Sequence, residues 1–151
     1  MGFATPSLKG RALRLLARRE YARAELAAKL APHVQANDDL EALLHELEAQ
    51  GFLSDARAAE SLLRRRAPRL GTQRVLQELR HKGLDAELVR TAADSLRTTE
   101  FARAQAVWQR RFGTLPADAQ ERARQMRFLA ARGFSTEIAH KVLRAAEQAE
   151  D

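Results

Sequence analysis

Apolar residues recur every three or four positions along nearly the whole chain, which is the spacing of one face of an α-helix. Near the N-terminus, Leu8, Ala12 and Leu15 follow this pattern, and Leu40, Leu43 and related positions repeat it further on. The same spacing continues to the C-terminal segment. The pattern predicts nine helices joined by short loops.

Residues that favour helix ends separate these apolar segments. Asp38 with Glu41 resembles a capping box at the start of the third predicted helix. The seventh helix is expected to begin at Thr98 or Thr99. The other predicted starts lie near Ser54, Thr72, Asp85, Pro116 and Ser135.

One segment of the chain is repeated. Residues 82–88 recur fifty positions later at 132–138, with a basic residue, a glycine and an apolar residue leading into the next helix. We therefore predict three units of three helices, at 1–52, 53–97 and 98–151. Because each unit is too small to bury a sufficient core alone, neighbouring units must stack on one another.

Composition narrows the fold class. The chain of 151 residues has 30 Ala and 22 Leu but only five Val and one Ile, so helix formers greatly exceed strand formers. The expected fold is all-α, with three tandem helix-turn-helix-like repeats in an elongated curved array. Without cysteine there are no disulfides. No stretch is long and apolar enough to span a membrane or serve as a secretion signal, so we expect a cytoplasmic protein.

The net charge alternates in sign along the chain with the period of the repeat. The net charge of +6 is distributed as +5 over 1–35, −6 over 36–56, +6 over 57–82 and −2 over 83–100. The last unit continues the alternation, being basic first and acidic at its end. In each unit the first two helices are therefore basic and the third acidic. An excess of basic over acidic residues favours an anionic partner such as nucleic acid or an acidic protein surface.

Catalytic patterns are absent from the sequence. It contains no Walker loop, no nucleophile elbow and no zinc-protease signature, and its four histidines are scattered. We expect no enzyme activity, no metal and no cofactor. Phe101, Trp108 and Phe112 share the apolar face of one predicted helix and are expected in the core. Phe52 and Phe134 follow helix-ending glycines, where an apolar contact is common.

Clusters of basic residues are the candidate binding elements. A run of charge often only solvates a helix face, but recurrence in several units favours a stripe that contacts an extended anionic partner. The candidate residues are Arg64, Arg65, Arg66, Arg69, Arg74, Arg80, Lys82, Arg110, Arg111, Arg122, Arg124, Arg127 and Arg132.

Several of these segments together resemble the RecX family of bacterial recombination regulators. The similar segments are 18–21, 51–55, 71–75, 110–113 and 132–135, and their order and spacing cover nearly the whole chain. The resemblance implies a curved array of three three-helix repeats that binds RecA filaments on single-stranded DNA. It also implies inhibition of the ATPase, strand-exchange and co-protease activities of RecA, and so an effect on DNA repair, recombination and the SOS response.

Two other function classes remain open from the residues alone. Three-helix modules resemble helix-turn-helix units, so the protein could be a DNA-binding transcriptional regulator. It could also be a passive scaffold that binds through its acidic third helices. For the RecX-like alternative we expect a monomer, with weak direct DNA binding in addition to filament binding.

Overall fold

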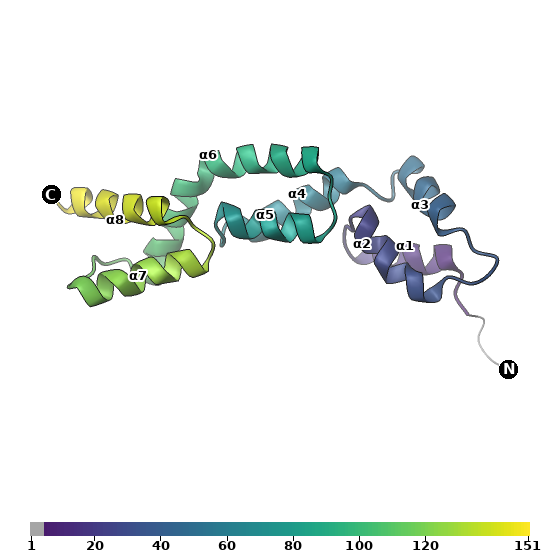
Figure 1. Cartoon of the computed structure of the whole chain (residues 1–151), viewed down its shortest axis with the longest axis horizontal. Helices are drawn as coiled ribbons and strands as arrows, with labels where there is room; N and C mark the ends of the chain where they lie inside the picture. Colours follow the sequence, from purple (N-terminus) through teal and green to yellow (C-terminus); the bar gives the residue numbers. More distant parts are fainter. Residues whose placement is uncertain (1–4) are drawn as a thin grey trace.

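The computed structural model describes residues 5–151, which form helices joined by short loops and contain no strand. The helices lie along one elongated body, with the N-terminal and C-terminal helices at opposite ends (Figure 1). They are α1 (Leu8–Arg18), α2 (Arg23–Leu30), the 3₁₀ helix η1 (Ala31–His33), α3 (Leu40–Ala49), α4 (Asp55–Arg66), α5 (Thr72–His81), α6 (Ala86–Arg111), α7 (Ala119–Ala131) and α8 (Thr136–Glu150).

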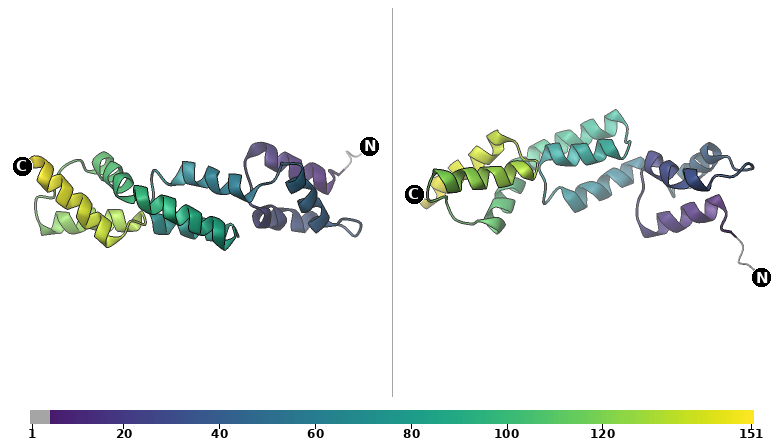
Figure 2. Two further views of the ribbon diagram at one scale, coloured as in Figure 1. Left: turned by 90° about the horizontal axis from the view of Figure 1, so that it is seen from above. Right: turned by 60° about the horizontal axis from the view of Figure 1, so that its bottom comes forward.

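Three separate apolar cores follow one another along this body (Figure 2). The first lies among α1, α2 and α3, the second among α4, α5 and the first half of α6, and the third among the rest of α6, α7 and α8. The predicted all-helical repeat array is therefore confirmed, whereas the unit borders at 52/53 and 97/98 stay predictions. Representative core residues, in chain order, are Leu26, Leu47, Leu76, Leu79, Leu129 and Leu143.

Several helix starts agree with the capping residues in the sequence, but α7 begins at Ala119 after the cap Asp118 and not near Pro116. The Ser54, Asp85 and Ser135 side chains each accept a hydrogen bond from the backbone N–H three residues later. The prediction of Asp38 as the cap of α3 is wrong, because Asp39 accepts from the Ala42 N–H instead. The Asp38 carboxylate is turned back to the preceding loop, where it accepts from the Gln35 N–H at 2.8 Å.

The predicted helix start at Thr98 or Thr99 is also wrong, because α6 runs unbroken from Ala86 to Arg111. The Thr98 hydroxyl donates to the Ser95 carbonyl and the Thr99 hydroxyl to the Leu96 carbonyl. These bonds satisfy the hydroxyls within the helix, so neither threonine acts as a cap. Residues 5–151 therefore contain eight α-helices rather than nine.

The two phenylalanines that follow glycines behave differently. Gly51 and Gly133 both take the left-handed backbone conformation that ends a helix, with φ of +81° and +94°. Phe134 is then buried, as predicted, but Phe52 is 50 % exposed, so the apolar contact expected for it is wrong. The next residue, Leu53, fills the first core in its place.

The boundary between the second and third cores is held by one arginine of α6. The Arg103 guanidinium donates to the backbone carbonyls of Ala67, Leu70 and Leu96 and to the Thr72 hydroxyl. Ala67 and Leu70 lie in the loop after α4, where carbonyl groups lack helical partners. Arg103 thus satisfies these carbonyls and ties the loop to the middle of α6.

The buried Glu100 carboxylate lies close to this arginine and accepts the Thr72 N–H. Burial lowers the pKa of Arg103 below its usual value, while the charge of Glu100 acts in the opposite direction. An arginine stays protonated at physiological pH even when its pKa is lowered. A positive charge is therefore fixed inside the boundary, compensated by one carboxylate.

Backbone contact completes the same boundary. The Gly71 N–H donates to the Arg132 carbonyl at 2.8 Å. A Cβ atom on Gly71 would lie 2.2 Å from the carbonyl carbon and oxygen of Gly133, so only glycine fits. The loop before α5 therefore lies directly against the loop between α7 and α8.

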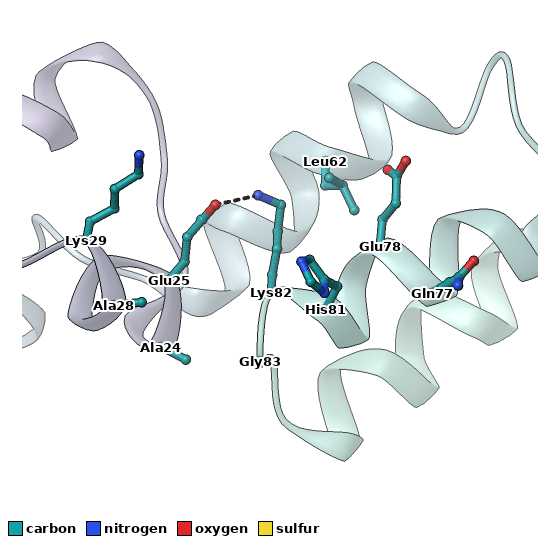
Figure 3. Close-up of a pocket in the computed structure, with 10 residues that line it drawn as sticks. All are labelled: Ala24, Glu25, Ala28, Lys29, Leu62, Gln77, Glu78, His81, Lys82 and Gly83. Carbon is teal, nitrogen blue, oxygen red and sulfur yellow. Dashed lines mark hydrogen bonds and ion pairs between the residues drawn. The ribbon is translucent and has the colours of Figure 1, made fainter. Parts of the chain in front are cut away.

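The boundary between the first and second cores is more polar. The Glu25 carboxylate of α2 accepts hydrogen bonds from Arg19, from Lys82 after α5, and from the Ala22 N–H. A cavity of about 650 Å³ opens between α2 and α5, and Figure 3 shows Glu25 and Lys82 reaching toward each other across it. Burial acts to raise the pKa of Glu25, but the hydrogen bonds from Arg19 and Lys82 outweigh it and keep the pKa below its usual value.

Because the folded-state pKa of Glu25 is lowered, its stabilising contribution is complete above the ordinary glutamate pKa of about 4.3 and disappears as the pH falls through the lowered value. We expect Glu25→Gln to lower the free energy of unfolding by about 1–2 kcal/mol at pH 7. This difference from the wild type should shrink toward pH 3. Urea unfolding at several pH values measures it.

The matched control is Glu60→Gln, since Glu60 is exposed and forms no ion pair within residues 5–151. Equal pH profiles for the two variants would show that Glu25 does not stabilise the boundary.

Candidate functional site

The basic residues predicted as one stripe fall into several groups with different surroundings. Two of these residues, Arg66 and Lys82, stabilise the fold. Arg66 pairs with Glu78 of α5 at 2.9 Å, and Lys82 pairs with Glu25 at 2.8 Å. Since their charges are compensated within the protein, they are poor candidates for binding a partner.

Two further candidates form exposed ion pairs around α7. Arg122 contacts Glu147 of α8 at 3.2 Å, and Arg124 contacts Glu121 at 3.4 Å. Exposed pairs of this kind contribute little stability and are easily exchanged. These arginines remain available to a partner, but part of their charge is already offset.

Arg111 and Arg132 lie over aromatic rings of the third unit. Their guanidinium carbons are 5.4 Å and 5.0 Å from the centre of the Phe128 ring, and that ring meets Phe112 edge to face. Cation–π contacts hold the guanidinium planes in place while leaving N–H groups free to donate. The arrangement presents two oriented cations on an aromatic support.

The end of α4 carries the least compensated charge among the candidates. Arg64, Arg65 and Arg69 are exposed, and within residues 5–151 their side chains make no ion pair and no hydrogen bond. Arg110 lies nearby, donating to the Pro68 carbonyl at 3.4 Å. Arginines in the last turn of a helix are favoured by its dipole, so α4 supports this concentration of charge. Arg127 of α7 is likewise exposed and unpaired within the described part of the chain.

A second basic surface surrounds Arg80 of α5. Arg74 donates to the Ala131 carbonyl at 2.9 Å, which holds it where the second unit meets the third. Gln73, Gln77, Arg74 and Arg80 line one shallow hollow, and Arg80 also lines the next hollow along α6. We name as the Arg80 surface the residues Gln73, Arg74, Gln77, Arg80, Arg90 and Arg97.

Arg90 and Arg97 were missed from the sequence because they lie in the acidic segment 83–100. Their spacing of seven residues was the available signal, since it places both on one face of α6. Arg97 makes only a loose contact of 3.6 Å with Asp94. Arginine forks pair in bidentate fashion with carboxylates and phosphates, so the Arg80 surface suits an anionic partner.

The described residues show no candidate for metal chemistry. Within residues 5–151, no three His, Cys, Asp or Glu side chains are grouped so that they could hold a metal ion. In the same range, none of the helices combines the length and apolar character that crossing a membrane requires.

Comparison with known proteins identifies similar sequences and folds. Residues 54–92 match the family model described as RecX, second three-helix domain, and residues 98–143 match RecX, third three-helix domain. The chain is 54 % identical to the Regulatory protein RecX of Leptothrix cholodnii over 96 % of this chain and 92 % of that protein. It is 50 % identical to the Regulatory protein RecX of Ralstonia nicotianae over 93 % and 89 %.

A crystal structure of RecX from Lactobacillus salivarius has the same fold. It superposes with a TM-score of 0.77 at 18 % sequence identity, covering 93 % of this chain and 95 % of the other. The elongated arrangement of helices is therefore shared by proteins of widely different sequence.

Proposed function

The chain belongs to the RecX family of regulatory proteins, and we propose that it binds RecA filaments on single-stranded DNA and inhibits RecA. The inhibited activities are the ATPase, strand exchange and co-protease functions, so the protein restrains DNA repair, recombination and the SOS response. It acts as a cytoplasmic monomer, by contact, and carries out no chemistry of its own. The observation that carries the proposal is that the units are linked in a row and that the second unit carries exposed arginines with no ion-pair partner among residues 5–151.

Linked units suit a partner that is itself repetitive. The body of this protein is elongated (Figure 2). A filament presents the same surface again and again, so a binder of that shape reaches more than one copy. Each contact can then be weak, because the first one raises the local concentration for the next. Since Arg103 and the Gly71 contact join the second and third units firmly, these two units hold the bound subunits in a single geometry.

The unpaired arginines at the end of α4 are the strongest candidates for the contact with the filament. Arg64, Arg65 and Arg69 lie on a short stretch and offer uncompensated charge to phosphates or carboxylates. The Arg80 surface adds further basic residues on the second unit, and the pair Arg111 and Arg132 adds two on the third. This arrangement supports a contact that continues across two units.

The proposal predicts that the protein inhibits the DNA-dependent ATPase of RecA at less than one copy per RecA monomer. Replacing Arg64, Arg65 and Arg69 together by glutamine should raise the amount needed for half inhibition about tenfold, equivalent to about 1.4 kcal/mol of binding free energy. The inhibition should also become less sensitive to salt, because fewer counterions are released. A titration of ATPase rate at several salt concentrations measures both effects.

The matched control replaces Lys9, Lys141 and Arg144 by glutamine, which removes the same charge from exposed positions elsewhere. Unchanged ATPase at equimolar wild-type protein would refute the proposed function. If the wild type inhibits and the α4 variant inhibits equally well, the contact lies on another surface. Tighter binding to duplex DNA than to RecA–DNA filaments would instead favour the helix-turn-helix regulator.

A further inference from the structure

The first unit contains a basic groove that the sequence analysis did not single out. Arg11, Arg14 and Arg18 of α1 face Lys29 of α2 and His33 of η1 across a hollow of about 190 Å³. Two leucines, Leu15 and Leu30, complete its lining. We name this feature the α1–α2 groove.

Helix geometry explains why these side chains converge. Arg11, Arg14 and Arg18 have the spacing i, i+3, i+7, so they form a row along one face of α1. Lys29 and His33, four residues apart, form the opposite row. Leu15 and Leu30 belong to the first core, which fixes α1 against α2 and so fixes the distance between the rows.

The charge of this groove is not compensated by the protein. Within residues 5–151, none of Arg11, Arg14, Arg18 and Lys29 takes part in an ion pair or a side-chain hydrogen bond. No carboxylate lines the groove.

The basic residues next to the groove, in contrast, form ion pairs within the protein. Lys9, Arg19 and Arg23 all pair with glutamates of the first unit. Asp38 lines the adjoining hollow with Arg11, where its carboxylate accepts from the Gln35 N–H and, among residues 5–151, forms no ion pair. The fold thus brings together four cations without an ion-pair partner among residues 5–151, while the neighbouring cations are paired with glutamates, which marks the groove as a place for an external anion.

We propose that the α1–α2 groove binds the sugar–phosphate backbone of a nucleic-acid strand. From Arg11 to Arg18 the helix rises about 10 Å. A row of this length spans consecutive phosphates of one strand, so its cations can pair with more than one phosphate at a time. An acidic protein would need several carboxylates within the same short distance to offer equal charge. The regular row of guanidinium groups therefore favours a polyphosphate.

The lining also indicates how the strand is recognised. No Phe, Tyr or Trp side chain lines the groove, and His33 offers only one small ring, so a row of bases has no extended platform on which to stack. The donors are cationic and suit phosphate oxygens, while the leucines suit the sugars. Binding is therefore independent of sequence and strongly dependent on salt.

The groove lies in the N-terminal unit, at the opposite end of the body from the third unit (Figure 1). None of its lining residues belongs to the arginines at the end of α4 or to the Arg80 surface. Binding of a strand in the groove does not require RecA, so it can be tested without a filament.

The test measures binding of a fluorescently labelled single-stranded DNA oligonucleotide to the whole protein by anisotropy, across a range of salt concentrations. We expect R14Q/R18Q/K29Q to bind about tenfold more weakly than the wild type at low salt. The slope of log K against log salt should fall in magnitude by about 2, since each lost phosphate contact on a single strand contributes about 0.7. Glutamine is chosen because it keeps the helix propensity and most of the side-chain length.

The control K9Q/K141Q/R144Q loses the same charge outside the groove and should keep the wild-type slope. Equal slopes for the two triple variants would overturn the proposal. So would a groove variant that binds the strand normally but no longer inhibits the RecA ATPase, because the groove would then contact protein. If circular dichroism shows that the triple variant is unfolded, the single variants R14Q and K29Q decide the question with expected changes of about 0.7 each.

Discussion

Replacing Arg103 by methionine is expected to lower the free energy of unfolding by about 3 kcal/mol. The guanidinium is a hydrogen-bond donor to the Ala67 and Leu70 carbonyls, and methionine would leave both without a partner. Each buried polar group left unpaired costs about 1–3 kcal/mol. The variant would also leave the buried Glu100 carboxylate without its neighbouring positive charge.

In a protein of this length, such a loss corresponds to a decrease in Tm of about 6–12 °C. Differential scanning calorimetry measures it directly. Arg103→Lys is the informative companion, since an ammonium group keeps the charge near Glu100 but cannot reach all four acceptors. It should fall between the wild type and the methionine variant. A methionine variant as stable as the wild type would show that water replaces the guanidinium without loss.

Gly71→Ala should destabilise the protein by about 3 kcal/mol through a single methyl group. The new Cβ would lie 2.2 Å from backbone atoms of Gly133, and no change of side-chain rotamer can relieve a clash with backbone. Overpacking of this kind typically costs about 1–3 kcal/mol, and rigid surroundings favour the upper value. The two loops must separate, which also weakens the hydrogen bond from the Gly71 N–H to the Arg132 carbonyl.

Gly51→Ala provides the matched control. Gly51 has a φ of +81°, yet nothing lies within 4 Å of a Cβ built on it, so alanine there meets only backbone strain of about 1–2 kcal/mol. Gly71 has an ordinary φ of −75°, so its substitution acts through the clash alone. Urea unfolding compares the two, and small-angle X-ray scattering reports any change of shape. If Gly71→Ala were no more destabilising than Gly51→Ala, the close contact would not constrain the boundary.

Local features of the fold could be predicted well from the sequence. Caps such as Ser54, Asp85 and Ser135 act through bonds that span three residues, so the sequence contains all the information needed. The repeat of 82–88 at 132–138 likewise reflects a local structure, a helix end with glycine in the left-handed conformation followed by a capped helix start.

Features that depend on distant residues could not be predicted in this way. The sequence does not show that Arg66 pairs with Glu78. It also does not show that Lys82 pairs with Glu25, which lies 57 positions away. Nothing in the sequence around Arg103 distinguishes a half-buried arginine from an exposed one. The only sign of the α1–α2 groove in the sequence is the charge of +5 over residues 1–35. The two rows of side chains come together only when α1 packs on α2, and the sequence does not show that packing.

The continuous α6 limits how this chain can be divided. Its N-terminal half supplies Val89 and Leu96 to the second core, and its C-terminal half supplies Ala104 and Trp108 to the third. Cutting the chain at 97/98 would create two new helix ends without caps and would separate Arg103 from the loop that it supports. We therefore expect the second and third units to fold and to be degraded together, although their sequences resemble two copies of one module.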